Sequence, residues 1–152
     1  MLNDAVRKDD AGNPAAHLPP PVGAYAYARR AGGLLFLAGI GPRAAGTHGI
    51  PGVMLDAAGN VSTYDIESQV HQCFANVRAA LAQHGARWEQ IVDVTVFLTD
   101  LPRDFAAFNH LWAEYFADEA TRPCRTTVEV SRLPQAGSAP INFEVKVVAA
   151  FS

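Results

Sequence analysis

The sequence predicts an α+β domain in which two helices cover one face of a mixed β-sheet. Three observations predict it: two segments with helical apolar spacing, segments of β-branched or alternating residues, and their order along the chain, ββαβαββ. A length of 152 residues favours one domain. We place it at residues 21–152, after a flexible N-terminal tail of residues 1–20 that runs into a row of prolines.

The first two strands are predicted at residues 25–31 and 34–39. They are joined by Gly32-Gly33, a dipeptide typical of tight hairpins. A long loop over residues 41–61, rich in Gly and Pro, follows. Loops of this length inside a compact domain are usually functional or interfacial.

The first helix is predicted to begin after Ser62 and Thr63, with Asp65 as the capping-box partner of Ser62, and to end at Gly85. Its apolar stripe consists of Ile66, Val70, Cys73, Phe74, Val77 and Leu81.

The second helix is predicted to be capped by Asp100, with Pro102 in its first turn. Its apolar stripe consists of Phe105, Phe108, Leu111, Trp112, Tyr115 and Phe116.

The remaining strands are predicted at residues 91–98, 125–133 and 141–150. Alternation puts Arg125 and Thr127 on one face of their strand, and Glu144 on the polar face of the last strand. We expect Arg125 and Glu144 to face the same way. Two helices cover only one side of a sheet, so we expect the other face to meet another subunit.

Composition narrows the function classes. Apolar residues make up 49% and charged residues 18%, which is enough apolar material for a core and excludes wholesale disorder. A net charge of −3 lacks the basic footprint of a nucleic-acid binder. The N-terminal residues hold no apolar signal segment, and the two cysteines, Cys73 and Cys124, form no disulfide framework. We therefore predict a cytoplasmic protein with neither nucleic acid nor membrane as a partner.

Cofactor and metal motifs are weak. GIGPRA, residues 39–44, matches a dinucleotide fingerprint, but loop residues follow it where a helix is required. The five histidines form no metal set. His71 follows Glu67 by four residues and His110 precedes Glu114 by four, so we expect surface ion pairs. We predict neither a metal nor a cofactor.

Four residues are candidates for chemistry. Arg125 opens a strand, and its planar fork suits a carboxylate; the alternative is a salt bridge across an interface. Glu144 is a candidate general acid or base, or a partner of Lys146 or Arg125. Asn109 falls within the second apolar stripe, where a buried amide would either fix a loop or bind a ligand. Tyr25 would stack on a ligand or pack.

Several segments together resemble the RidA (YjgF-type) imine/enamine deaminase family. They are GAY, AGIGP, DVTVFLTDLPRDFAAFN and RPCRTTVEVSRLP, followed by a final acidic strand, and the resemblance spans residues 22–150. It implies a chorismate-mutase-like fold and a homotrimer with an active site in each cleft between subunits. The stretches GIGPR, IPGV and DIESQVHQCFANVR look most like the 2-aminomuconate deaminase branch.

The resemblance also implies roles for single residues. Arg125 would hold the substrate carboxylate, Glu144 would position or activate water, and Tyr25, Gly39 and Asn109 would line the cleft. Two positions depart from the family pattern: Ala38 replaces the usual Ser, and Thr127 stands where a Cys is frequent. We count Thr127 among the substrate-binding residues.

The expected reaction is cofactor-independent hydrolysis of 2-aminomuconate to 4-oxalocrotonate (2-oxohex-3-enedioate) and ammonia, in the degradation of aromatic compounds. Arg43, just beyond the strand that ends at Gly39, is the candidate donor for the second carboxylate of this substrate; the alternative is a solvated loop arginine. Two other functions stay open: a general deaminase of 2-aminoacrylate and 2-imino acids, and a non-catalytic binder of small carboxylates. A ribonuclease fits poorly, because the chain lacks a basic-aromatic patch.

Overall fold

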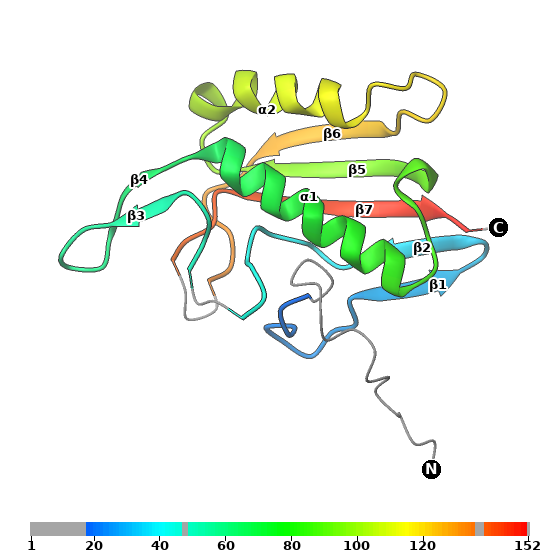
Figure 1. The fold of residues 1–152 in the computed structure, drawn as a ribbon, viewed down its shortest axis with the longest axis horizontal. Coiled ribbons are helices and arrows are strands. Elements are labelled where there is room, and N and C mark those ends of the chain that lie inside the picture. The colour runs from blue at the N-terminus through cyan, green and yellow to red at the C-terminus, as the bar shows by residue number, and fades with distance from the viewer. Residues whose placement is uncertain (1–17, 47–48, 136–138, 152) are drawn as a thin grey trace, which may run out of the picture.

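Two helices lie against one face of a five-stranded sheet in the computed structural model, which describes residues 18–46, 49–135 and 139–151 (Figure 1). The strand order is β1-β2-β7-β5-β6. The strands are β1 (Ala28–Ala31), β2 (Leu34–Leu37), β5 (Ile91–Leu98), β6 (Cys124–Glu129) and β7 (Phe143–Ala150). The sheet is mixed because β5 and β6 run parallel while the other neighbours are antiparallel. The predicted α+β class is confirmed.

Helix α1 (Ile66–Gln83) begins one residue after Asp65, whose carboxylate accepts from the backbone amides of Glu67 and Ser68. Asp65 is therefore the N-cap itself, and the predicted capping box on Ser62 and Thr63 is wrong because those residues lie in a strand. The C-terminal prediction is confirmed: Gly85 has a φ of 75°, a left-handed conformation that glycine adopts without strain.

Helix α2 (Leu101–Tyr115) begins as predicted. The Asp100 side chain accepts from the backbone amide of Arg103, and a proline occupies the first turn. The predicted apolar stripe needs one correction, because Phe105 is 38% exposed. Most of the remaining stripe packs around Phe74 of α1, which lies between 4.7 and 6.5 Å from the rings of Trp112, Tyr115 and Phe116.

The segment between β2 and α1 is not entirely loop, contrary to the prediction for residues 41–61. It contains a two-stranded hairpin of β3 (Val53–Leu55) and β4 (Val61–Tyr64), which extends away from the main sheet (Figure 1). The hairpin was missed because these strands are short and mostly exposed: Met54 is 64% and Leu55 49% exposed, and Tyr64 at the end of β4 is the residue that packs against the core.

The strand boundaries also shift. Strand β1 begins at Ala28 rather than at Tyr25, and β6 and β7 are shorter than predicted. The predicted hairpin dipeptide is confirmed, because Gly32 and Gly33 both have positive φ angles between β1 and β2. Of the predicted tail, residues 1–17 lie outside the described residues, whereas Leu18 packs against the core.

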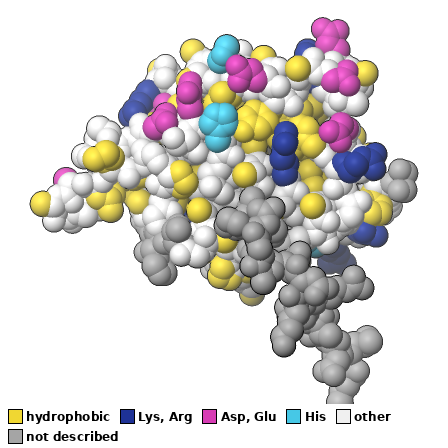
Figure 2. Space-filling model, viewed as in Figure 1, with side chains coloured by type: hydrophobic (Ala, Val, Ile, Leu, Met, Phe, Trp, Pro, Cys, Tyr) yellow, Lys and Arg dark blue, Asp and Glu magenta, His cyan; other side chains and the backbone are white. Residues whose placement is uncertain are grey.

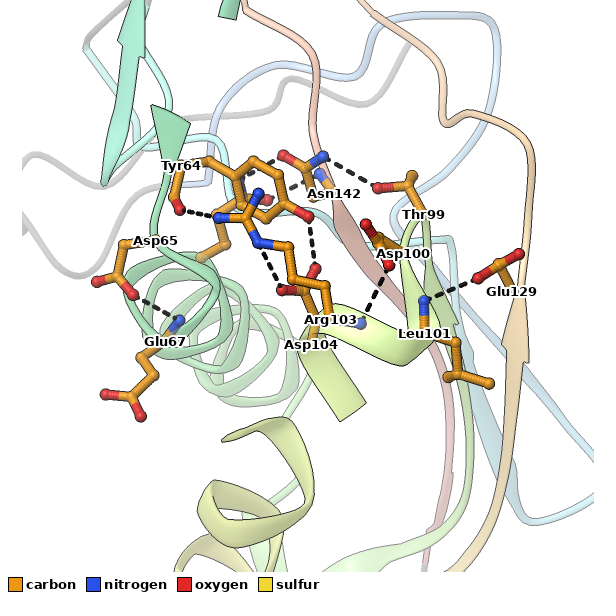
Figure 3. A network of polar contacts seen from close by, with 11 residues as sticks. Tyr64, Asp65, Glu67, Thr99, Asp100, Leu101, Arg103, Asp104, Glu129 and Asn142 are labelled. Carbon is orange, nitrogen blue, oxygen red and sulfur yellow. Dashed lines mark hydrogen bonds and ion pairs between the residues drawn. The ribbon is translucent and has the colours of Figure 1, made fainter. Parts of the chain in front are cut away.

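A polar network links the base of the β3–β4 hairpin to the start of α2 (Figure 3). The Tyr64 hydroxyl donates to Asp104 Oδ2 at 2.6 Å, and Arg103 Nη2 donates to the Tyr64 carbonyl at 2.9 Å. Asp104 is only 2% exposed, and this burial raises its pKa, while the Tyr64 hydrogen bond and the Arg103 charge oppose the rise. The network secures the end of β4 to α2.

Figure 2 shows the helix-covered face. Hydrophobic side chains are visible between the helices, and charged side chains surround them. His110 lies 3.2 Å from Glu114 as predicted, but His71 bonds the Tyr115 hydroxyl at 2.6 Å instead of pairing with Glu67. Within the described residues, no helix is both long and apolar enough to span a membrane.

Replacing Tyr64 by Phe removes the hydroxyl that serves the buried Asp104 carboxylate. We expect the free energy of unfolding to fall by about 1–3 kcal/mol. The loss should be larger at pH 7 than at pH 4, because Tyr64 favours the ionised form of Asp104. Urea denaturation at both pH values measures it. Tyr115→Phe, which removes a hydroxyl on the helical surface, is the control; equal losses in the two variants would contradict a special role for this network.

Candidate functional site

Strand register places Arg125 and Glu144 on opposite faces of the sheet. Arg125 pairs with Val94, and Val94 pairs with Val147, so these three side chains share the helix-covered face. Glu144 pairs with Phe97, which pairs with Val128, on the face that the helices leave open. The prediction that Arg125 and Glu144 face the same way is therefore wrong. Each residue alternates correctly in its own strand, but only the pairing decides which faces coincide.

Arg125 and Thr127 lie on β6 at the free edge of the sheet, on the face that α2 covers. We refer to these two residues, together with Asn109, as the Arg125 edge. The guanidinium carbon of Arg125 lies 5.3 Å from the ring centre of Phe108 and 4.9 Å from that of Trp112. Arg125 Nη1 and Thr127 Oγ1 are both buried, and neither has a hydrogen-bond partner among the described residues. Burial lowers the pKa of Arg125. Donors in this state are suited to a ligand with acceptor oxygens.

Asn109 is exposed, so the predicted buried amide is wrong. Its helical position nevertheless places it on the side of α2 that carries Phe105 and Trp112. It follows Phe105 by four residues and precedes Trp112 by three, and both rings lie within 5.9 Å of the Arg125 guanidinium carbon. Asn109 therefore stays a candidate of the Arg125 edge.

A separate cavity of about 220 Å³ contains the other predicted residues, and we name it the Glu144 cavity. It brings together Tyr25, Gly39, Arg43 and Glu144. Tyr25 is 42% exposed and precedes β1. The structure thus divides the predicted site residues into two groups on different faces of one chain.

Glu144 is held in the cavity by close backbone packing. A Cβ atom at Gly39 would overlap Glu144 Oε1, so glycine at this position allows the carboxylate to lie against the backbone as it does here. The Glu144 carboxylate forms no ion pair or hydrogen bond with the side chains or backbone of the described residues. Lys146, one proposed partner, donates instead to the Leu37 carbonyl. Burial raises the pKa of Glu144, which suits a group that exchanges protons near neutral pH.

Sequence reasoning missed several residues of the Glu144 cavity, namely Val22, Gly41, Pro134 and Ile141, and it noted Ala38 only as a departure from the family pattern. A signal was present for one of them. Gly39 and Gly41 are two residues apart at the end of an extended segment, so both lie on the same face. A Cβ at Gly41 would lie 2.9 Å from Ile141 Cδ1, so both glycines allow the close approach of side chains from β7 and the residues just before it.

Comparison with known proteins gives consistent matches. The family model described as endoribonuclease L-PSP matches residues 15–151. A RutC family protein of Synechocystis is 44% identical over 79% of this chain and 83% of its own length. The "Putative reactive intermediate deaminase TdcF" of Escherichia coli is 30% identical over 86% of this chain and 89% of its own.

Solved structures agree with the sequence matches. The YjgF gene product of Escherichia coli superposes with a TM-score of 0.67 at 29% identity, covering 87% of this chain and 91% of that one. Escherichia coli TdcF with bound serine superposes with a TM-score of 0.68 at 28% identity, covering 88% of this chain and 93% of the other.

Replacing Glu144 by Gln should stabilise the fold in a pH-dependent way. Because burial raises the pKa of Glu144 in the folded state, the unfolded chain releases this proton at a lower pH than the folded chain. The stability of the wild type therefore falls as pH rises from the ordinary glutamate pKa through the raised value. The Glu144→Gln variant lacks this titrating group, so its advantage in stability should increase between pH 4 and pH 8.

Denaturation in urea at matched protein concentration measures this advantage, with Glu119→Gln, at an exposed position, as the control. A difference between Glu144→Gln and wild type that stays constant with pH would contradict a desolvated carboxylate.

Proposed function

We propose that this chain, which belongs to the endoribonuclease L-PSP family that includes the RidA/YjgF and RutC proteins, is a reactive-intermediate deaminase. The proposal is supported by the relative from Escherichia coli that is named a putative reactive intermediate deaminase, because its match spans most of this chain. The reaction is hydrolysis of an enamine or imine next to a carboxylate, with release of ammonia.

The observation that supports the proposal most is the pair of unsatisfied charged groups. Arg125 presents a buried guanidinium nitrogen without a partner among the described residues, beside the equally unpartnered Thr127 hydroxyl. Glu144 presents a desolvated carboxylate at a cavity. Hydrolysis of a 2-imino acid needs these two functions: a bidentate donor for the carboxylate and a proton-exchanging group near the attacked carbon.

The chemistry follows from these roles. The enamine tautomerises to an imine by gaining a proton on carbon and losing one from nitrogen, which makes C2 electrophilic. Arg125 orients the adjacent carboxylate, and Glu144 takes a proton from the water that attacks C2. Glu144 then passes this proton to the nitrogen, the new hydroxyl group gives up its own proton to the nitrogen, and ammonia leaves as C2 becomes a ketone. An imine hydrolyses readily in water, so orientation and one acid–base group are sufficient help.

Within one chain the two groups cannot meet, because the sheet separates them. We therefore propose that each site forms between copies of the chain, with Arg125 from one copy and Glu144 from its neighbour, in a homotrimer. The open sheet face supports such an assembly, since Phe36 and Val128 are each 37% exposed there. Closed rotational symmetry would produce one such site at every interface.

Arg43 supports a dicarboxylate as the preferred substrate. It lines the Glu144 cavity and brings a second cation to the site, which a six-carbon substrate such as 2-aminomuconate would use for its far carboxylate. A general 2-imino acid deaminase has no need for this donor. A non-catalytic binder is the other alternative, since one relative is known with bound serine; turnover assays separate the two.

Arg125→Ala and Glu144→Gln test both the chemistry and the shared site. We expect each variant alone to form trimers in light scattering but to lose deamination of 2-iminopropionate. Loss of the Arg125 contact should weaken transition-state binding by about 2–5 kcal/mol. Glu144→Gln should lower kcat with little change in KM.

Mixing the two inactive variants during refolding should restore activity. In randomly mixed trimers, about a quarter of the interfaces join an intact Glu144 to an intact Arg125. We therefore expect about a quarter of wild-type turnover. A mixture as inactive as its parts would contradict a site between copies, and wild-type rates in both single variants would contradict the deaminase.

Arg43→Ala tests the dicarboxylate preference. We expect kcat/KM for 2-aminomuconate to fall about tenfold and kcat/KM for 2-iminopropionate to stay unchanged, because only the first substrate loses a contact. Arg132→Ala is the matched control, since Arg132 lines the adjoining cavity, which shares Pro134 and Ile141 with the Glu144 cavity. Equal losses on both substrates would remove Arg43 from substrate recognition, and a selective loss in the Arg132 variant would move the far carboxylate to that cavity.

A further inference from the structure

Arg43 is held at its backbone by a buried amide. Asn76 of α1 is 5% exposed, and its Nδ2 donates to the carbonyl of Gly41 at 2.9 Å and to the carbonyl of Arg43 at 2.7 Å. Gln72 Nε2 donates to Asn76 Oδ1 at 3.0 Å, which fixes the orientation of the amide. The segment after β2 is therefore attached to α1 at the residue whose side chain lines the Glu144 cavity.

The side chain of Arg43 is held from a different direction, by residues 18–22, which we name the strap. The strap and the loop after β2 lie next to each other (Figure 1). Arg43 Nη2 donates to the Pro20 carbonyl at 3.4 Å, and the Tyr27 hydroxyl donates to the neighbouring carbonyl of Pro19. Two successive carbonyl oxygens of the strap thus accept hydrogen bonds, one from Tyr27 and the next from Arg43.

Tyr27 and Arg43 also act on each other. Burial raises the pKa of Tyr27, and the charge of the nearby Arg43 guanidinium opposes the rise. A guanidinium has five N–H donors, so the hydrogen bond with Pro20 leaves others for a ligand. Tyr27 itself lies beside Arg43 in a smaller neighbouring cavity and does not line the Glu144 cavity.

We infer that Tyr27 and the strap are positioning elements that hold the Arg43 guanidinium at the Glu144 cavity, so that the site recognises the second carboxylate of a dicarboxylate ligand. This inference rests on the proposed function for its substrate class. An unrestrained arginine would lose side-chain entropy on binding a carboxylate, and the contacts with Tyr27 and Pro20 reduce that loss beforehand.

Tyr27→Phe is the decisive variant, because it keeps the ring that packs edge-to-face on Tyr25 at 6.3 Å and removes only the hydroxyl. Binding of adipate, a six-carbon dicarboxylate, is compared with binding of hexanoate by calorimetry. We expect adipate affinity to fall about threefold to tenfold and hexanoate affinity to stay unchanged. In deamination, KM for 2-aminomuconate should rise at constant kcat.

The double variant Tyr27→Phe/Arg43→Ala separates positioning from general packing. If Tyr27 acts through Arg43, the double variant should bind adipate as weakly as Arg43→Ala and no more weakly. Tyr27→Gln provides a rescue and a second variant if Tyr27→Phe does not fold, because its amide offers both an acceptor and a donor. It should retain more of the adipate preference than Arg43→Ala does.

Two results would overturn the inference: equal weakening of adipate and hexanoate in Tyr27→Phe, or a further loss of adipate binding when Tyr27→Phe is added to Arg43→Ala. A wild type that binds adipate no better than hexanoate would overturn it as well. Because calorimetry requires no turnover, these outcomes are distinct from failure of the deaminase itself, which the Arg125 and Glu144 variants report with 2-iminopropionate.

Discussion

The position of β5 between β7 and β6 is the constraint on which the rest of the structure depends. It pairs antiparallel with β7 and parallel with β6, and these two registers decide which side chains share a face. Arg125 joins the helix-covered face and Glu144 the open face as a direct result. A shift of one residue in either pairing would reverse this assignment. The division of the candidate site into two separate groups is therefore a property of the sheet.

Each group carries a charge that is costly to bury without a partner. The Arg125 guanidinium lies among aromatic rings, and the Glu144 carboxylate lies against the backbone at Gly39. Elsewhere in the described chain, buried polar side chains are satisfied: Asp104 by Tyr64, Gln69 by Asn142, and Asn76 by two carbonyl oxygens. The contrast separates groups that maintain the fold from groups that are available for chemistry.

The loop after β2 is held by a buried polar group that maintains the fold, and it carries a residue that is available for chemistry. Its glycines bring the backbone close to β7, and the buried Asn76 fixes its course against α1. Arg43 leaves this loop at the cavity that contains Glu144. The position of a binding residue on a loop depends on the contacts that hold the loop. Here these contacts come from α1 and from residues 18–22.

The sequence alone determined the elements that depend on local patterns: the two helices, the Gly32-Gly33 turn, the Asp100 cap and strand β5 with its boundaries. Its motifs also singled out Arg125 and Glu144. Tertiary structure alone decided that they lie on opposite faces, that Asn109 is exposed, and that Tyr27 and Pro20 reach Arg43. The reason is physical. Capping, periodicity and turn preference act between residues close in the chain, whereas register and burial depend on partners far apart in it.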